Sequence, residues 1–224
     1  TKTQPLEMET LRRAAGVAAR SLVGKSSALF ALPTNTTVAA HAVTIGVELG
    51  AYSFTEFKTK NEKSSETLKQ ANILVHDLFV NKASFQEAQI IAASIKNVRN
   101  LVNTPPSHMY PETFASYVKK TFKKNSKLTV EILEEKALKK QGFGALIGVG
   151  QGSINPPRFI RLAYKSRGAD FHLALVGKGI TFDTGGISLK PPSSMHTMKC
   201  DMAGAATVVE TLRAIMDLDL KINV

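Results

Sequence analysis

Amphipathic helical patterns alternate with short apolar runs along this chain, and the alternation constrains its fold more than any other feature. Apolar residues spaced as on one face of a helix predict helices over residues 5–22, 36–53, 85–103, 111–124 and 203–216. Short apolar runs between them predict strands at residues 26–34, 69–75, 127–133, 158–165, 171–177 and 220–224. Helices that alternate with strands indicate an α/β layer.

Prolines provide the clearest division of the chain. The helix predicted over residues 85–103 ends at Pro105 and Pro106, which cannot continue it, and Pro111 suits the first turn of the next helix. We therefore expect three parts: residues 1–84, a linking helix at 85–104, and residues 105–224.

Composition excludes several classes of protein. A content of 43% hydrophobic and 21% charged residues over 224 positions is not that of a disordered chain. The longest apolar runs fall far short of the roughly 18 residues that a membrane-spanning helix needs. The first residues carry charges where a secretory signal would be apolar, and a single cysteine excludes an intramolecular disulfide framework. We therefore expect a cytoplasmic protein without a membrane partner.

The charge balance leaves an anionic partner open. The 29 Lys and Arg against 18 Asp and Glu give a net charge of +11, which permits binding to DNA. The densest cluster, Lys119, Lys120, Lys123, Lys124 and Lys127, lies at a predicted helix end without interleaved aromatic residues. A solvated helix end, where cations suit the helix dipole, is the favoured interpretation.

Glycine-rich stretches do not have the spacing of nucleotide-binding motifs. A phosphate-binding loop would need glycine at position 19, where Ala19 stands before Gly24-Lys25-Ser26. A dinucleotide fingerprint that starts at Gly177 would need glycine at position 182, where the chain has Phe182.

Lys178, Asp183, Lys190 and Asp201 lie among small and apolar residues between positions 173 and 206. Lys178 and Asp183 directly follow the apolar run at 171–177, which we expect to be a central strand covered on both faces. Charges in such a place are costly unless they are paired or bound to metal. Because ligands bind at the carboxyl ends of strands in α/β sheets, this is where we expect chemistry.

Asp201 and Lys190 each also have a structural interpretation. Asp201, beside the helix predicted at 203–216, could be its N-cap, and Lys190 before Pro191 could be a solvated loop lysine. A hydrolytic metal site normally needs three or more protein ligands, so spacing alone leaves a metal open.

The segment GKGITFDTGGISLK, followed by MKCDMAGAA, closely resembles the signature of the leucyl (cytosol) aminopeptidase family. Similarity continues upstream through NTPPSHMYPETFA and GVGQGSINPPRFIRLAY, so that it covers at least residues 85–224. The resemblance implies a mixed α/β sheet with helices on both faces, the first part of a catalytic domain. Part of a smaller α/β N-terminal domain precedes it.

The resemblance also implies a function: release of N-terminal amino acids, leucine-like residues preferred, from peptides by water activated at two divalent metal ions. Zinc or manganese, or else magnesium, would be the metals. Asp183 resembles the carboxylate that bridges both ions, Asp201 a ligand of one ion, and Lys178 an unusual lysine ligand that must be neutral, a form that burial and metal charge favour. Lys190 matches the lysine that stabilises the oxyanion, and Met198 matches a residue lining the substrate pocket.

Further properties of the family are also implied. Its remaining metal ligands and an arginine that holds a bicarbonate base belong to an Asn-Thr-Asp-Ala-Glu-Gly-Arg motif, which is absent from these 224 residues. The chain is therefore expected to be part of a longer protein, inactive alone, that forms homo-hexamers. The alternatives are a DNA-binding regulator or a structural protein of the same family, and His196 with Cys200 could form a separate soft-metal site.

Overall fold

The computed structural model describes residues 7–59, 67–75, 82–123 and 126–224. The chain forms two compact units, Thr1–Asn97 and Val98–Val224, which we call the N-terminal and C-terminal units. The boundary falls within the helix α3 (Lys82–Asn103).

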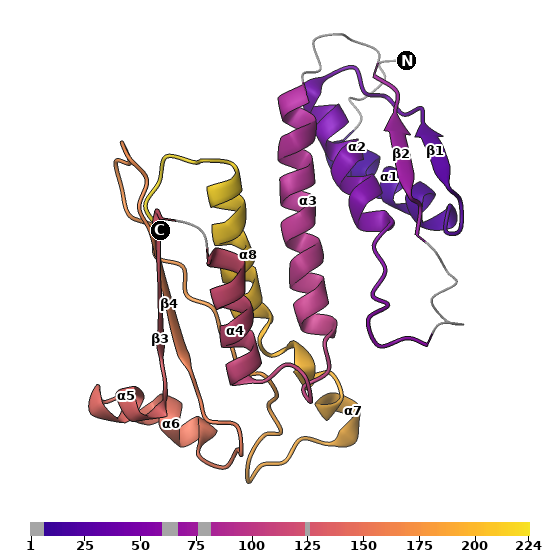
Figure 1. Ribbon diagram of the computed structural model, residues 1–224. Helices are drawn as coiled ribbons and strands as arrows, with labels where there is room; N and C mark the ends of the chain where they lie inside the picture. The colour runs from indigo at the N-terminus through magenta and orange to yellow at the C-terminus, as the bar shows by residue number, and fades with distance from the viewer. Residues whose placement is uncertain (1–6, 60–66, 76–81, 124–125) are drawn as a thin grey trace. The chain divides into compact units, whose positions relative to one another are not determined.

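The N-terminal unit combines helices with a small parallel sheet. Its elements are α1 (Met8–Ser21), β1 (Ser27–Phe30), α2 (Thr37–Gly50), β2 (Gln70–Ile73) and the first part of α3. Strands β1 and β2 pair in parallel, with Ser27 opposite Gln70 (Figure 1). The core joins Leu11 and Ala15 of α1 to Val43 and Val47 of α2, and Phe30 is the one buried residue of β1.

Helices α1 and α2 pack closely because glycines face the contact. A Cβ on Gly46 would lie 2.2 Å from the carbonyl oxygen of Arg12 and 2.9 Å from the Cβ of Ala15. A Cβ on Gly50 would lie 2.2 Å from the carbonyl oxygen of Gly16. Backbone atoms cannot move aside as a flexible side chain can, so any residue larger than glycine would push the two helices apart.

We predict that Gly46→Ala lowers the free energy of unfolding by about 1–3 kcal/mol, because the added methyl overpacks the helix contact. The matched control is Gly148→Ala, in helix α6, where an added Cβ meets no atom within 4 Å. There the higher helix propensity of alanine should act alone. Urea denaturation of both variants measures the difference, and equal stabilities would contradict the packing argument.

The C-terminal unit places two long helices beside an antiparallel pair of strands (Figure 1). Strands β3 (Leu128–Leu133) and β4 (Phe159–Tyr164) pair so that Leu128 lies opposite Tyr164. The remaining elements are α4 (Pro111–Phe122), α5 (Glu135–Lys140), α6 (Gly144–Gly150), α7 (Pro192–Met195), the 3-10 turn η2 (Met198–Cys200) and α8 (Ala203–Asp217). One hydrophobic cluster contains Phe114 and Val118 of α4, Leu212 and Ile215 of α8, and Tyr164 of β4.

A buried carboxylate fixes α4 against α8. Glu210 of α8 is only 1% exposed and accepts a short hydrogen bond from the Tyr117 hydroxyl of α4. Arg213, one turn along α8, lies 3.7 Å from the same carboxylate. Burial, followed by the hydrogen bond to Glu210, raises the pKa of Tyr117 to about 12.

We predict that the Tyr117 contribution to stability is complete below pH 10 and is lost as the pH rises from 10 toward 12. The folded state keeps the phenol proton over that range, whereas the unfolded chain releases it near its ordinary pKa of 10.0. Urea denaturation across this pH range tests the decline. Tyr117→Phe should remove this part of the pH dependence and cost about 1–3 kcal/mol at pH 7, because the buried Glu210 carboxylate loses the hydrogen bond from the Tyr117 hydroxyl. An identical alkaline decline in both proteins would contradict the assignment.

The structure confirms the α/β class and most of the expected elements, with α4 beginning at Pro111 as expected. The expected central strand at 171–177 is wrong. Within the described residues this segment has a single bridge, from His172 to Asn223, and Val176 is 95% exposed. An apolar run favours burial, but a strand also needs neighbouring strands that form hydrogen bonds with its backbone groups. Here the bridge to Asn223 is the pairing that the described residues provide.

Other expectations hold only in part. The strand expected at 220–224 contributes that bridge and a pair of backbone hydrogen bonds between Val224 and Tyr164. Strand β1 is shorter than expected, and two of its four residues are exposed. Residues 5–6 of the first expected helix, and Lys124 of the lysine cluster, lie outside the described residues. Across the parts of the chain that are described, no helix has the length and apolar character to cross a membrane.

Candidate functional site

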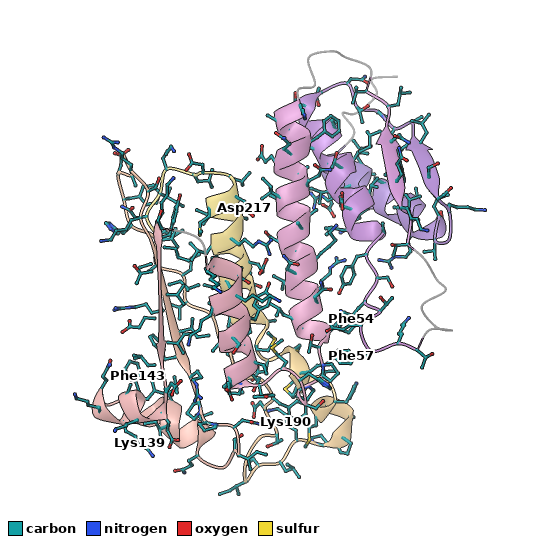
Figure 2. The ribbon with its side chains drawn as sticks, viewed as in Figure 1. Phe54, Phe57, Lys139, Phe143, Lys190 and Asp217 are labelled. Atoms are coloured by element: carbon teal, nitrogen blue, oxygen red, sulfur yellow. The ribbon has the colours of Figure 1, made fainter. Side chains whose placement is uncertain are left out.

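The four candidate residues lie on an irregular segment and on the turn before α8. Residues 173–190 have no regular secondary structure, and the chain then passes through α7 and η2 into α8. Figure 2 labels Lys190 in this part of the C-terminal unit. The side-chain partners of the four residues show how they are brought together.

Backbone contact with the start of α8 positions Lys178. The amide of Ala205 donates a hydrogen bond of 2.8 Å to the carbonyl oxygen of Lys178. This approach requires glycine, because a Cβ on Gly177 would lie 2.6 Å from the carbonyl oxygen of Gly204. The Lys178 ammonium consequently lies 3.1 Å from Oδ1 of Asp201.

Asp201 is not the N-cap of α8. The N-cap is Met202, which makes no side-chain cap bond, and the Asp201 amide bonds the Met198 carbonyl at 3.1 Å within the turn. The Asp201 side chain is 17% exposed, and its Oδ2 is buried and has no hydrogen-bond partner among the described residues. A buried carboxylate oxygen without a partner is costly, so this atom is suited to a donor or a cation.

Asp183 and Lys190 form an ion pair, in addition to the pair between Lys178 and Asp201. The Lys190 ammonium lies 2.8 Å from Asp183 Oδ2 and donates to the Asp183 carbonyl at 3.2 Å. The Gly185 amide donates to Asp183 Oδ1 at 2.9 Å, and Gly185 has a φ of 94°, which favours glycine. The interpretation of Lys190 as a solvated loop lysine is therefore wrong, since its side chain is 27% exposed and doubly bonded.

The two pairs influence one another electrostatically. The hydrogen bond from Lys190, followed by that from the Gly185 amide, lowers the pKa of Asp183, with smaller contributions from the charges of Lys190 and Lys178. Lys178 thus acts on Asp183 while it pairs with Asp201. Asp183 is held as a carboxylate, the form that binds a cation.

The donor set fits part of a site for divalent metal. Asp183 and Asp201 supply carboxylate oxygens, and Oδ2 of Asp201 is the unpartnered one. In the described ranges, His, Cys, Asp and Glu do not form any group of three or more that could hold a metal by themselves. We expected Lys178 to be buried. That expectation is wrong, because its side chain is 59% exposed.

The remaining expected site residues lie nearby in the chain. Met198 opens the 3-10 turn and is partly buried, and its role in substrate binding stays a prediction. Cys200 is exposed, and the His196 ring nitrogen Nδ1 lies 3.1 Å from the Pro192 carbonyl oxygen. Lys199 was not expected to have a role here, but it donates to the Asn103 carbonyl at 3.4 Å and ties the turn to the end of α3. No sequence signal distinguishes it from a surface lysine.

We predict that Gly177→Ala lowers the free energy of unfolding by about 1–3 kcal/mol and moves Lys178 away from Asp201, because the new methyl collides with the α8 backbone. Gly179→Ala is the matched control: its Cβ would lie 3.1 Å from the side chain of Ala205, so it should cost less. Urea denaturation measures both costs. Equal costs in the two variants would contradict the role given to the Gly177 contact.

Comparison with protein families matches both units of the chain. Residues 96–224 match the catalytic domain of the cytosol aminopeptidase family, and residues 2–61 match its N-terminal domain. The first of these matches begins beside the boundary between the two compact units.

Similar proteins agree with this match. Over 222 residues the chain is 45% identical to a probable cytosol aminopeptidase of Micrococcus luteus, covering 96% of this chain and 43% of that protein. It is 46% identical over 222 residues to a probable cytosol aminopeptidase of Corynebacterium diphtheriae, covering 98% and 43%. The chain therefore spans less than half the length of these relatives.

Two solved structures have similar folds. The bottromycin maturation enzyme BotP in complex with Mn has a TM-score of 0.84 and 30% identity, covering 97% of this chain and 46% of that one. The cytosol aminopeptidase of Coxiella burnetii has a TM-score of 0.80 and 27% identity, covering 97% and 44%.

Proposed function

The chain belongs to the cytosol aminopeptidase family, and we propose that it contributes part of the active site of a metal-dependent aminopeptidase. The reaction is hydrolysis of the first peptide bond of a peptide, which releases the N-terminal amino acid. The observation that carries this proposal is the pairing of Lys178 with Asp201 and of Lys190 with Asp183, with one buried carboxylate oxygen left unpartnered.

Asp183, Asp201 and Lys178 are the residues that would hold divalent metal. The unpartnered Oδ2 of Asp201 and the carboxylate form of Asp183 support this assignment. When bound, such ions supply Lewis acidity that activates water and polarises the scissile carbonyl. Manganese is a reasonable choice, because the similar protein BotP is described in complex with Mn.

Lys190 supplies a preorganised positive charge. Its hydrogen bond to the backbone carbonyl of Asp183 and its largely covered side chain keep the ammonium close to Asp183. A fixed cation that meets the oxyanion of the tetrahedral intermediate stabilises charge that develops only in the transition state. Met198, partly buried three residues before Asp201, would border the first side chain of the substrate.

The family alone supports the remaining parts of the proposal. These are a preference for leucine-like residues, the use of two metal ions, a bicarbonate base, a homo-hexamer and a cytoplasmic location. DNA binding and a purely structural role stay alternatives without a specific observation in their favour. The charge of +11 permits the former.

We predict that Lys190→Met in the full-length protein lowers kcat for a leucyl chromogenic peptide by about 10²–10³, because a transition-state cation is lost.

Asp201→Asn should lower both activity and bound manganese, since it removes a metal-holding carboxylate. Steady-state kinetics and elemental analysis of the purified variants measure the two effects.

Asp170→Asn is the matched control, because Asp170 is an exposed carboxylate of the same unit outside the four-residue arrangement. It should retain both activity and metal. Wild-type kcat in Lys190→Met, or wild-type metal content and activity in Asp201→Asn, would overturn the residue assignments. A folded, metal-loaded wild-type protein without peptidase activity would overturn the proposed function itself.

A further inference from the structure

Lys190 closes the segment 183–190 into a loop. Its ammonium bonds both the side chain and the backbone carbonyl of Asp183, and its own amide donates to the Thr184 carbonyl at 2.9 Å. The lysine stem is also packed, because a Cβ on Gly185 would lie 3.2 Å from Cγ of Lys190. One residue therefore ties the end of the loop to its beginning in three ways.

The two carboxylates of the site differ in how their oxygens are occupied. Both oxygens of Asp183 are engaged, Oδ1 by the Gly185 amide and Oδ2 by the Lys190 ammonium. Asp201 has Oδ1 paired with Lys178, whose side chain is mostly exposed, and Oδ2 without a partner. The charge at Asp183 is thus already balanced by a cation belonging to the chain.

A divalent ion at Asp183 would meet this ammonium. Two cations drawn to the same carboxylate oxygen repel one another, and the repulsion is strong where water is partly excluded. The ion therefore gains less at Asp183 while Lys190 lies 2.8 Å from Oδ2 than it would if the lysine moved away.

We infer that Lys190 is a stand-in cation, which keeps Asp183 and its loop in place in the metal-free protein and is displaced from Asp183 Oδ2 when metal binds. The inference rests on the proposed function, because it needs a metal at Asp183. It gives Lys190 a role before catalysis: it holds the empty loop in order and lowers the affinity for metal.

The test uses the full-length protein, freed of metal by a chelator, with Lys190→Met, Lys190→Arg and Lys140→Met as variants. Lys190→Met keeps the length of the side chain and loses its charge, and Lys190→Arg keeps a cation. Lys140→Met removes an exposed lysine at the end of α5 and controls for net charge. Amide hydrogen exchange of peptides covering residues 184–190 reports loop order, and titration calorimetry with Mn²⁺ alone reports metal affinity.

We expect exchange in the metal-free loop to be about tenfold faster in Lys190→Met, because hydrogen bonds to a charged group are lost. The difference should disappear once Mn²⁺ is bound. The affinity for Mn²⁺ should rise about tenfold in Lys190→Met, because the competing cation at Asp183 Oδ2 is removed. Lys190→Arg and Lys140→Met should stay near the wild type in both measurements.

Two results would overturn the inference, and they are distinguishable. Unchanged loop exchange, or unchanged or weaker Mn²⁺ affinity, in a Lys190→Met protein whose wild type binds Mn²⁺ would overturn the stand-in role alone. A wild-type protein that binds no Mn²⁺ would overturn the proposed metal site and this inference with it.

Discussion

The site depends on one close backbone contact, the hydrogen bond from the Ala205 amide to the Lys178 carbonyl. It forms only because Gly177 and Gly204 leave room for two backbones to touch. This contact holds an otherwise irregular segment against the first turn of α8. The helix itself is fixed by its buried face, where Glu210 meets Tyr117, so the contact places Lys178 on a rigid support.

That placement brings Lys178 to Asp201, and the loop 183–190 separately brings Lys190 to Asp183. With Lys178 beside Asp201 and Lys190 folded back on Asp183, each of the four residues has an opposite charge within 3.1 Å. Such pairs contribute little to stability when exposed, and they are costly when buried unless fully bonded. A function at this place is a better explanation of four charges among small residues than stability is.

The sequence was enough to predict most helices and strands. It also selected the four residues that the structure joins in two ion pairs, and their roles in a metal site stay predictions. The helix at 203–216 has a clear apolar period, and its counterpart α8 begins and ends within one residue of the prediction. The strand at 171–177 failed because an apolar run does not specify its neighbours. Which lysine pairs with which aspartate was also hidden. The Lys178–Asp201 pair depends on a contact between Gly177 and Gly204, far apart in sequence, and the Lys190–Asp183 pair depends on how the loop 183–190 turns back on itself. Lys199 carried no signal at all, since its acceptor is a backbone carbonyl of α3.

We propose that Asp183 and Asp201 hold divalent metal, and an anomalous difference map would show this metal at its ligands. Crystals of the full-length protein would be grown with Mn²⁺, and data collected at the manganese absorption edge. Anomalous peaks are expected about 2.0–2.3 Å from carboxylate oxygens of Asp183 and Asp201. Well-ordered carboxylates without such peaks, or manganese bound only elsewhere, would contradict it.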